Sequence, residues 1–211
     1  MNLTRRNVHR LGLGCLAAAW ATGGLARPLL ADHPDKFAPV LKTDSEFGSY
    51  TQSWFLQSFL NLSEDLEAAA ARGKRFAIMW DLDGCPYCRE THLVNFGKAG
   101  ITDYVRANFD ILQLDLRGSQ RVTDFDGKEM SEKELARRHG VRFTPTIQFF
   151  PETAGELKGK TRRQTEVARM PGYFKPAHFL SMFRFVREKA YEKSDFRSYL
   201  KSGASTVKGQ G

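Results

Sequence analysis

Cysteine is scarce in this chain, whose 211 residues contain three: Cys15, Cys85 and Cys88. So few cysteines exclude a small scaffold held together by several disulfides. The sequence also lacks a glycine-rich phosphate loop, a flavin or dinucleotide fingerprint, and the haem-attachment pattern Cys-x-x-Cys-His, because Arg89 follows Cys88. The sequence therefore gives no sign of a bound nucleotide, flavin or haem.

A hydrophobic run long enough to cross a membrane is missing as well. Residues 11–26 are uncharged and rich in Leu, Ala and Gly, but glycines interrupt them and they are shorter than the ~20 residues of a membrane span. They follow residues 4–10, which carry the pair Arg5-Arg6. This arrangement predicts an export signal of twin-arginine type over residues 1–31, cleaved after Ala26 or Ala31. A general secretory signal and an N-terminal membrane anchor are the alternatives.

A strong excess of one charge is missing from the rest of the chain. The full sequence has 32 Lys and Arg against 24 Asp and Glu, which gives a formal net charge of +8. Four arginines lie in the predicted signal, so its removal leaves 28 basic residues and a net charge of about +4. Basic runs such as residues 158–163 then resemble ordinary solvated surface, and we expect no nucleic-acid partner.

Removal of the signal also leaves Cys85 and Cys88 as the only cysteines. They stand in Cys85-Pro86-Tyr87-Cys88, after the apolar residues 76–80 and at the start of a helix-like stretch. A helix N-terminus presents unpaired N–H groups and a positive dipole end to the first sulfur, which stabilises a thiolate. Pro86 suits the first helical turn because its missing N–H would have been unpaired there. The pattern predicts a redox-active dithiol with Cys85 as nucleophile and a less exposed Cys88; a structural disulfide is the alternative.

Helix and strand signals alternate along the chain. Residues 63–71 begin with the capping residue Ser63 and predict a helix. Residues 75–80, in which the apolar residues 76–80 run without interruption, predict a central strand covered on both faces. Further helices are predicted at residues 90–96, 101–109, 131–140 and 176–191, and further strands at residues 111–116 and 146–150. We predict an extended lead-in over residues 32–50, a domain over 51–192 and a flexible tail over 193–211. The aromatic residues expected in the core are Trp54, Phe55, Phe59, Phe179, Phe183 and Phe185.

Several dispersed segments carry a family resemblance. Besides residues 84–88, they are residues 54–55, 58–60, 92–95, 123–127, 132–136 and 141–146, the last of which contains Phe143-Thr144-Pro145. With the order of helices and strands, they resemble the SoxW-type thioredoxins, exported thioredoxin-like proteins found with bacterial sulfur-oxidation systems. The resemblance covers about residues 54–191. It implies an α/β thioredoxin-like fold with a central mixed β-sheet flanked by helices.

The same resemblance implies an activity. A member of this family is a periplasmic protein-disulfide reductase that a membrane thiol transporter re-reduces. By this resemblance Cys85 attacks the partner disulfide, Cys88 resolves the intermediate, and Pro145 is a cis-proline that faces the disulfide. The residues bordering the partner-binding surface are then Pro86, Tyr87, Thr144 and Pro145. We expect disulfide-containing proteins as substrates, a monomer, and no cofactor beyond the Cys85–Cys88 dithiol.

One position departs from cytosolic thioredoxins. The buried acid that they carry six residues before the first cysteine is Met79 in this chain. Asp81 or Asp83 can take over proton transfer if either is held close to Cys88. The alternative is that both are ordinary solvated acids at the end of a strand.

Two other activities stay open at the level of sequence. The protein can be a thiol oxidase or isomerase, since the residues between the cysteines do not set the reduction potential. It can also be a non-catalytic metal-binding module made of Cys85, Cys88 and His92, which lies four residues after Cys88 on the same predicted helix face. Structural zinc sites usually have four ligands, however, and no fourth Cys or His is suitably spaced.

Overall fold

The computed structural model describes residues 40–43, 49–158, 160 and 165–208, with side chains up to residue 203. The predicted export signal and residues 32–39 of the lead-in lie outside the described residues. Within the described part of the lead-in, β1 (Leu41–Lys42) pairs antiparallel with β2 (Tyr50–Thr51). None of the helices in the described segments is long and apolar enough to cross a membrane.

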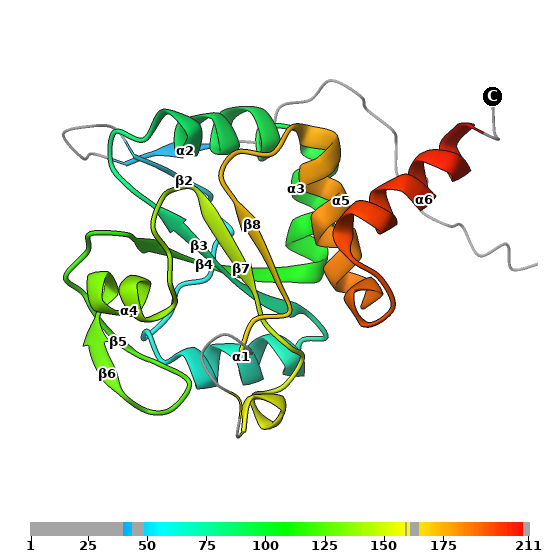
Figure 1. The fold of residues 1–211 in the computed structure, drawn as a ribbon. Helices are drawn as coiled ribbons and strands as arrows, with labels where there is room; N and C mark the ends of the chain where they lie inside the picture. The colour runs from blue at the N-terminus through cyan, green and yellow to red at the C-terminus, as the bar shows by residue number, and fades with distance from the viewer. Residues whose placement is uncertain (1–39, 44–48, 159, 161–164, 209–211) are drawn as a thin grey trace, which may run out of the picture. The chain divides into compact units, whose positions relative to one another are not determined.

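A four-stranded mixed sheet forms the centre of the fold (Figure 1). Its strands are β4 (Phe109–Asp115), β3 (Arg75–Asp81), β7 (Thr146–Phe149) and β8 (Ala168–Pro171), in that spatial order. β3 runs parallel to β4 and antiparallel to β7, which pairs antiparallel with β8. The predicted fold class, a mixed central sheet flanked by helices, is confirmed.

Side chains of β3 alternate between two apolar layers, one on each face of the sheet. Phe76, Ile78 and Trp80 pack with α1 (Leu62–Ala71) and α4 (Glu132–Arg138), whereas Ala77 and Met79 pack with α3 (Ala99–Asn108) and α5 (Pro176–Arg187). All seven residues of β3 are buried. The continuous apolar run therefore reflects a strand covered on both faces, as predicted. β5 (Arg121–Thr123) and β6 (Glu129–Ser131) form a separate hairpin that leads into α4.

The helix predicted at residue 63 starts slightly earlier, because α1 is capped by Asn61 rather than by Ser63. The side-chain oxygen of Asn61 accepts a hydrogen bond from the backbone N–H of Glu64. Asn61 supplies an acceptor at the N-cap as readily as a serine does, which allows the helix to begin two residues earlier.

The prediction of a flexible tail from residue 193 differs from the structure. Residues 196–208 form the helix α6 (Phe196–Lys208), which lies against α5 (Figure 1). Phe196 and Tyr199 share one helix face and pack on Phe185, with ring centroids 5.5 and 5.3 Å away. The segment is polar in overall composition, so its apolar face is not apparent from the sequence. The aromatic residues of that face pack against α5.

Phe59, which is predicted to lie in the core, is instead fully exposed, at 103% relative accessibility. The next residue, Leu60, takes a positive φ of 64° and packs against the α1 and α4 layer instead. Its carbonyl accepts a hydrogen bond from the Thr123 N–H. The turn at Leu60 thus directs Phe59 into solvent.

Candidate redox site

The cysteine pair lies where β3 ends and a helix begins. β3 stops at Asp81, the turn before Cys85 uses Gly84 at φ 74°, and α2 (Pro86–Glu90) continues as a π-helical segment, η1 (Thr91–Asn95). Glycine is suited to this turn because side-chain-bearing residues rarely adopt that φ. Cys85 is the N-cap residue of α2, and its Sγ accepts a hydrogen bond of 3.2 Å from the Cys88 N–H.

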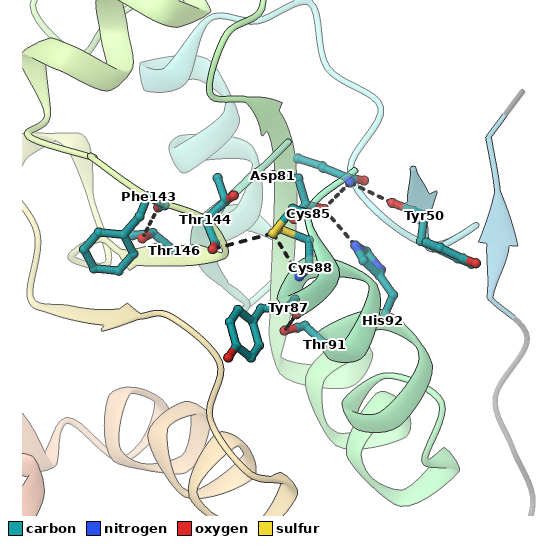
Figure 2. Close-up of a disulfide and its surroundings, with 11 residues drawn as sticks. Tyr50, Asp81, Cys85, Tyr87, Cys88, Thr91, His92, Phe143, Thr144 and Thr146 are labelled. Carbon is teal, nitrogen blue, oxygen red and sulfur yellow. Dashed lines mark hydrogen bonds and ion pairs between the residues drawn. A yellow bond between two sulfur atoms is a disulfide. The ribbon is translucent and has the colours of Figure 1, made fainter. Parts of the chain in front are cut away.

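Cys85 and Cys88 form a disulfide (Figure 2). The Cys85 residue is partly exposed, whereas Cys88 is buried at 4% relative accessibility. The expectation that Cys88 is the less exposed cysteine is therefore confirmed. A partner disulfide can approach Cys85 and cannot easily approach Cys88.

A loop before β7 faces the exposed sulfur. The peptide bond between Thr144 and Pro145 is cis, as the resemblance implied. The Thr144 carbonyl oxygen lies 3.6 Å from Cys85 Sγ, and the Thr146 hydroxyl donates a 2.8 Å hydrogen bond to the Phe143 carbonyl within the same loop. Figure 2 shows this loop on one side of the disulfide and Asp81 with His92 on the other. Cys85 thus has a backbone acceptor directly beside it.

Exposed aromatic side chains border the same surface. Tyr87 and Phe143 are 62% and 54% exposed, and both are unusual in this respect because most large apolar side chains of the described residues are buried. The Tyr87 ring stacks on Tyr173, with centroids 6.4 Å apart. Of the residues predicted to border a partner, Pro86 and Tyr87 come from α2, and Thr144 and Pro145 from the opposite loop.

A buried polar cluster lies behind the disulfide. Asp81 is only 7% exposed, and its Oδ2 accepts hydrogen bonds from His92 Nε2 at 2.8 Å and from Gln113 Nε2 at 2.6 Å. Asp83, in contrast, is exposed. Of the two acids considered from the sequence, the structure therefore places Asp81 inside the site and Asp83 outside it.

Gln113 is a member of this cluster that sequence reasoning missed. It lies on β4 opposite Met79 of β3, and its Nε2 also donates to the Tyr50 carbonyl at 2.8 Å. The available signal was a polar side chain between the apolar residues Ile111-Leu112 and Leu114 of β4, because a partly buried amide needs hydrogen-bonding partners.

A small cleft joins the cluster to the dithiol. It has a volume of about 200 Å³, and Asp81, Cys85, Cys88, Tyr50 and Arg89 are among the side chains that line it. The buried Oδ1 of Asp81 receives no hydrogen bond from any described residue. Oδ2 of Asp81 thus accepts hydrogen bonds from His92 and Gln113, whereas Oδ1 has no hydrogen-bond partner among the described residues.

The metal-binding module considered as an alternative is not assembled in the described residues. His92 is fully buried, with Nε2 bonded to Asp81 and Nδ1 3.2 Å from Gln52 Nε2, so neither ring nitrogen is directed at a cysteine. Within the described segments, no group of three or more His, Cys, Asp or Glu side chains is arranged to hold a metal ion.

A mixed sheet, a Cys-x-x-Cys pair at a helix N-terminus and a cis-proline loop beside it define a protein with the thioredoxin-like oxidoreductase fold. The sequence model of the family described as thioredoxin-like domain matches residues 62–187, which is more than half of the chain. The chain belongs to this family. A search of curated protein sequences finds no match.

One solved structure agrees with this assignment at the level of fold, and two others are reported with it as similar. A thioredoxin-fold protein from Helicobacter pylori is 21% identical, with a TM-score of 0.51 over 64% of this chain and 86% of that one. A thioredoxin from Thermus thermophilus is 27% identical, with a TM-score of 0.43 over 58% of this chain and 81% of that one. The oxidoreductase DsbH is 16% identical, with a TM-score of 0.43 over 72% of this chain and 94% of that one.

Proposed function

We propose that this protein is an exported protein-disulfide reductase that acts through Cys85 and Cys88. The observation that carries the proposal is the asymmetry of the pair, in which a partly exposed sulfur at a helix N-terminus is joined to a buried one. Thiol–disulfide exchange needs one accessible attacking sulfur and one intramolecular sulfur that ends the reaction. The partly exposed Cys85 suits the attacking role, and the buried Cys88 suits the resolving role.

In the first step, the Cys85 thiolate attacks one sulfur of a partner disulfide. The Cys88 N–H and the positive end of the helix stabilise the thiolate before the attack. An extended partner segment can pair with the backbone of Thr144, whose carbonyl lies beside Cys85. Tyr87, Phe143 and Pro145 then contact the side chains that flank the partner cysteine.

In the second step, Cys88 releases the partner. Its thiol gives up a proton, for which the nearby Asp81 carboxylate is the proposed acceptor, and the resulting thiolate attacks the Cys85 sulfur of the mixed disulfide. The bond between Cys85 and the partner breaks, and the Cys85–Cys88 bond forms. An electron pair has then passed to the partner, whose two sulfurs leave as thiols after taking up protons.

The cellular setting is proposed from the sequence. The twin-arginine-like leader supports export to the periplasm, and the resemblance to SoxW-type thioredoxins supports a link to sulfur oxidation. Because the periplasm is kept oxidising, a reductase there needs electrons from outside it. A membrane thiol transporter is the proposed donor.

A direct test uses the chain without residues 1–31 and follows the reduction of insulin disulfides by dithiothreitol. We expect Cys85→Ser to lose the catalysed rate entirely, because the attacking sulfur is gone. Cys88→Ser should accumulate a mixed disulfide at Cys85, detectable by mass spectrometry. Full activity in Cys85→Ser would contradict the proposed function.

A further inference from the structure

Two side chains fix the orientation of the Asp81 carboxylate. His92 and Gln113 both donate to Oδ2, at 2.8 and 2.6 Å. With Nδ1 of His92 directed at the Gln52 amide nitrogen, the ring proton is carried on Nε2 and points to Asp81. All the described donors to this carboxylate therefore act on one oxygen.

The other oxygen, Oδ1, is the atom that remains for accepting a proton. It is buried and receives no hydrogen bond from the described residues, and Asp81 shares the 200 Å³ cleft with both cysteines. A cleft of this size has room for a few water molecules. A proton that leaves Cys88 can thus reach Oδ1 directly or through one water.

We infer that His92 is a positioning residue for the second step of disulfide exchange: its Nε2–H holds Oδ2 of Asp81, so that Oδ1 faces the dithiol and accepts the Cys88 proton. This inference rests on the proposed function. Without the imidazole, the carboxylate loses one of its two donors, and Asp81 can turn Oδ1 away from Cys88.

The proton and electron changes of this step balance within the named groups. Cys88 Sγ–H gives its proton to Asp81 Oδ1, and the sulfur's electron pair forms the bond to Cys85. The partner thiolate leaves with the electron pair of the broken mixed disulfide. The proton on Asp81 then passes to this thiolate or to water, which restores the carboxylate.

Other groups that ionise also face this site. Tyr50 from β2 and Arg89 from α2 line the cleft, and Asp115 of β4 lies beside Asp81 in the parallel register. On its other side, Asp81 borders a second cavity of about 430 Å³ that Asp83 and Glu132 also line. A test by pH therefore needs a variant that changes His92 and leaves these groups in place.

Both steps can be followed in one reaction of the reduced protein with an excess of dithiobis(nitrobenzoate). Each step releases one coloured nitrothiobenzoate thiolate. The first release reports the attack by Cys85, and the second reports the attack by Cys88. For reduced His92→Phe without residues 1–31, we expect an unchanged first phase and a second phase slowed about tenfold at neutral pH. The second phase should also rise more steeply with pH than in the parent, because hydroxide must then remove the proton.

Conservative and coupled variants sharpen the result. His92→Gln places an amide donor near the Nε2 position, so its second phase should stay within about threefold of the parent. Asp81→Asn should slow the second phase as much as His92→Phe does. The double variant should be no slower than either single one, because His92→Phe misdirects the same proton acceptor that Asp81→Asn removes.

His139 provides the matched control because, among the described residues, it is a second histidine whose side chain is nearly buried and paired with an aspartate. Its Nε2 lies 3.0 Å from Asp124 Oδ1, and it faces a different cavity from the one at the disulfide. His139→Phe should lower stability and leave both phases unchanged. Should His92→Phe fail to fold, His92→Asn replaces it, because that side chain is too short to reach Asp81.

The inference is overturned if folded His92→Phe or His92→Asn keeps the parent's second phase, or if His139→Phe slows it equally. The proposed function has a separate readout. If Cys85→Ser still shows the first phase, the dithiol mechanism itself is wrong. If Cys85→Ser loses that phase while His92→Phe keeps a normal second phase, only the inference about His92 fails.

Discussion

Arg75 is a buried cation at the start of β3, and it joins three segments of the chain. Its side chain is 1% exposed and donates hydrogen bonds to the Phe150 and Val186 carbonyls, at 2.9 and 3.2 Å, and to the Tyr191 hydroxyl at 3.1 Å. Arg75→Met leaves these oxygens buried without the donor. We expect the free energy of unfolding to fall by about 2–4 kcal/mol, measured by urea denaturation.

Glu152 is the control for this prediction. Its Oε1 lies 3.8 Å from Arg75, but its side chain is 40% exposed. Glu152→Gln should therefore cost less than about 1 kcal/mol, because the Glu152 carboxylate is solvated and its 3.8 Å contact with Arg75 contributes little. An equal cost for Arg75→Met and Glu152→Gln would show that the buried hydrogen bonds of Arg75 contribute little net stability.

At the redox site, the sequence predicted the residues whose chemistry is local. The spacing of Cys85 and Cys88 and the helix that follows them are contained in a few consecutive residues. The polar cluster around Asp81 was not predictable in this way, because Asp81 bonds to His92 and Gln113, His92 bonds to Gln52, and these residues come from separate segments. His92 was singled out, but as a metal ligand, since only the fold shows that its nitrogens already have partners.

Among the elements, α6 is the one whose packing we predict to depend on alkaline pH. Burial raises the pKa of Tyr199 from 10.0 to about 12, assisted by a 2.9 Å hydrogen bond to Glu188. The folded state therefore keeps a proton that the unfolded chain has lost, so the stabilisation from Tyr199 is complete below pH 10 and disappears as the pH rises from 10 toward 12. We expect the packing of α6 on α5 to weaken in this range.

The measurement is an absorbance titration of tyrosinate in the parent and in Tyr199→Phe. The difference between the two curves should show one group that titrates near pH 12. A difference curve centred near pH 10 would mean that Tyr199 is not packed on α5. Lys201→Gln is a control at an exposed position of the same helix that leaves all tyrosines in place and should leave the titration unchanged.

The sequence was more informative about some elements than about others. The buried strands β3 and β7 and the amphipathic α5 follow from apolar patterns that are visible within one segment. α6 was missed because its aromatic residues pack on Phe185 of α5 and on Phe174, which belong to other segments of the chain. β8 was missed for a similar reason, because its four residues form a strand only by pairing with β7.

For the whole molecule, folding and the redox state of the dithiol are coupled. Reduction and unfolding form a thermodynamic cycle, so the state of the cysteine pair that the fold stabilises more is also the state that the protein tends to keep. A reductase gives electrons away readily, which requires that its fold favours the disulfide. An oxidase such as DsbA has a stabilised reduced form instead.

The proposed reductase should therefore unfold at a higher urea concentration when Cys85 and Cys88 are oxidised than when they are reduced. Its reduction potential, titrated anaerobically against a thiol buffer, should lie near the thioredoxin value of about −270 mV. The stabilisation of the Cys85 thiolate by the Cys88 N–H acts in the opposite direction, so the two measurements together decide which effect dominates. A more stable reduced form, with a potential nearer −120 mV, would identify a thiol oxidant and reverse the direction of electron transfer proposed for this site.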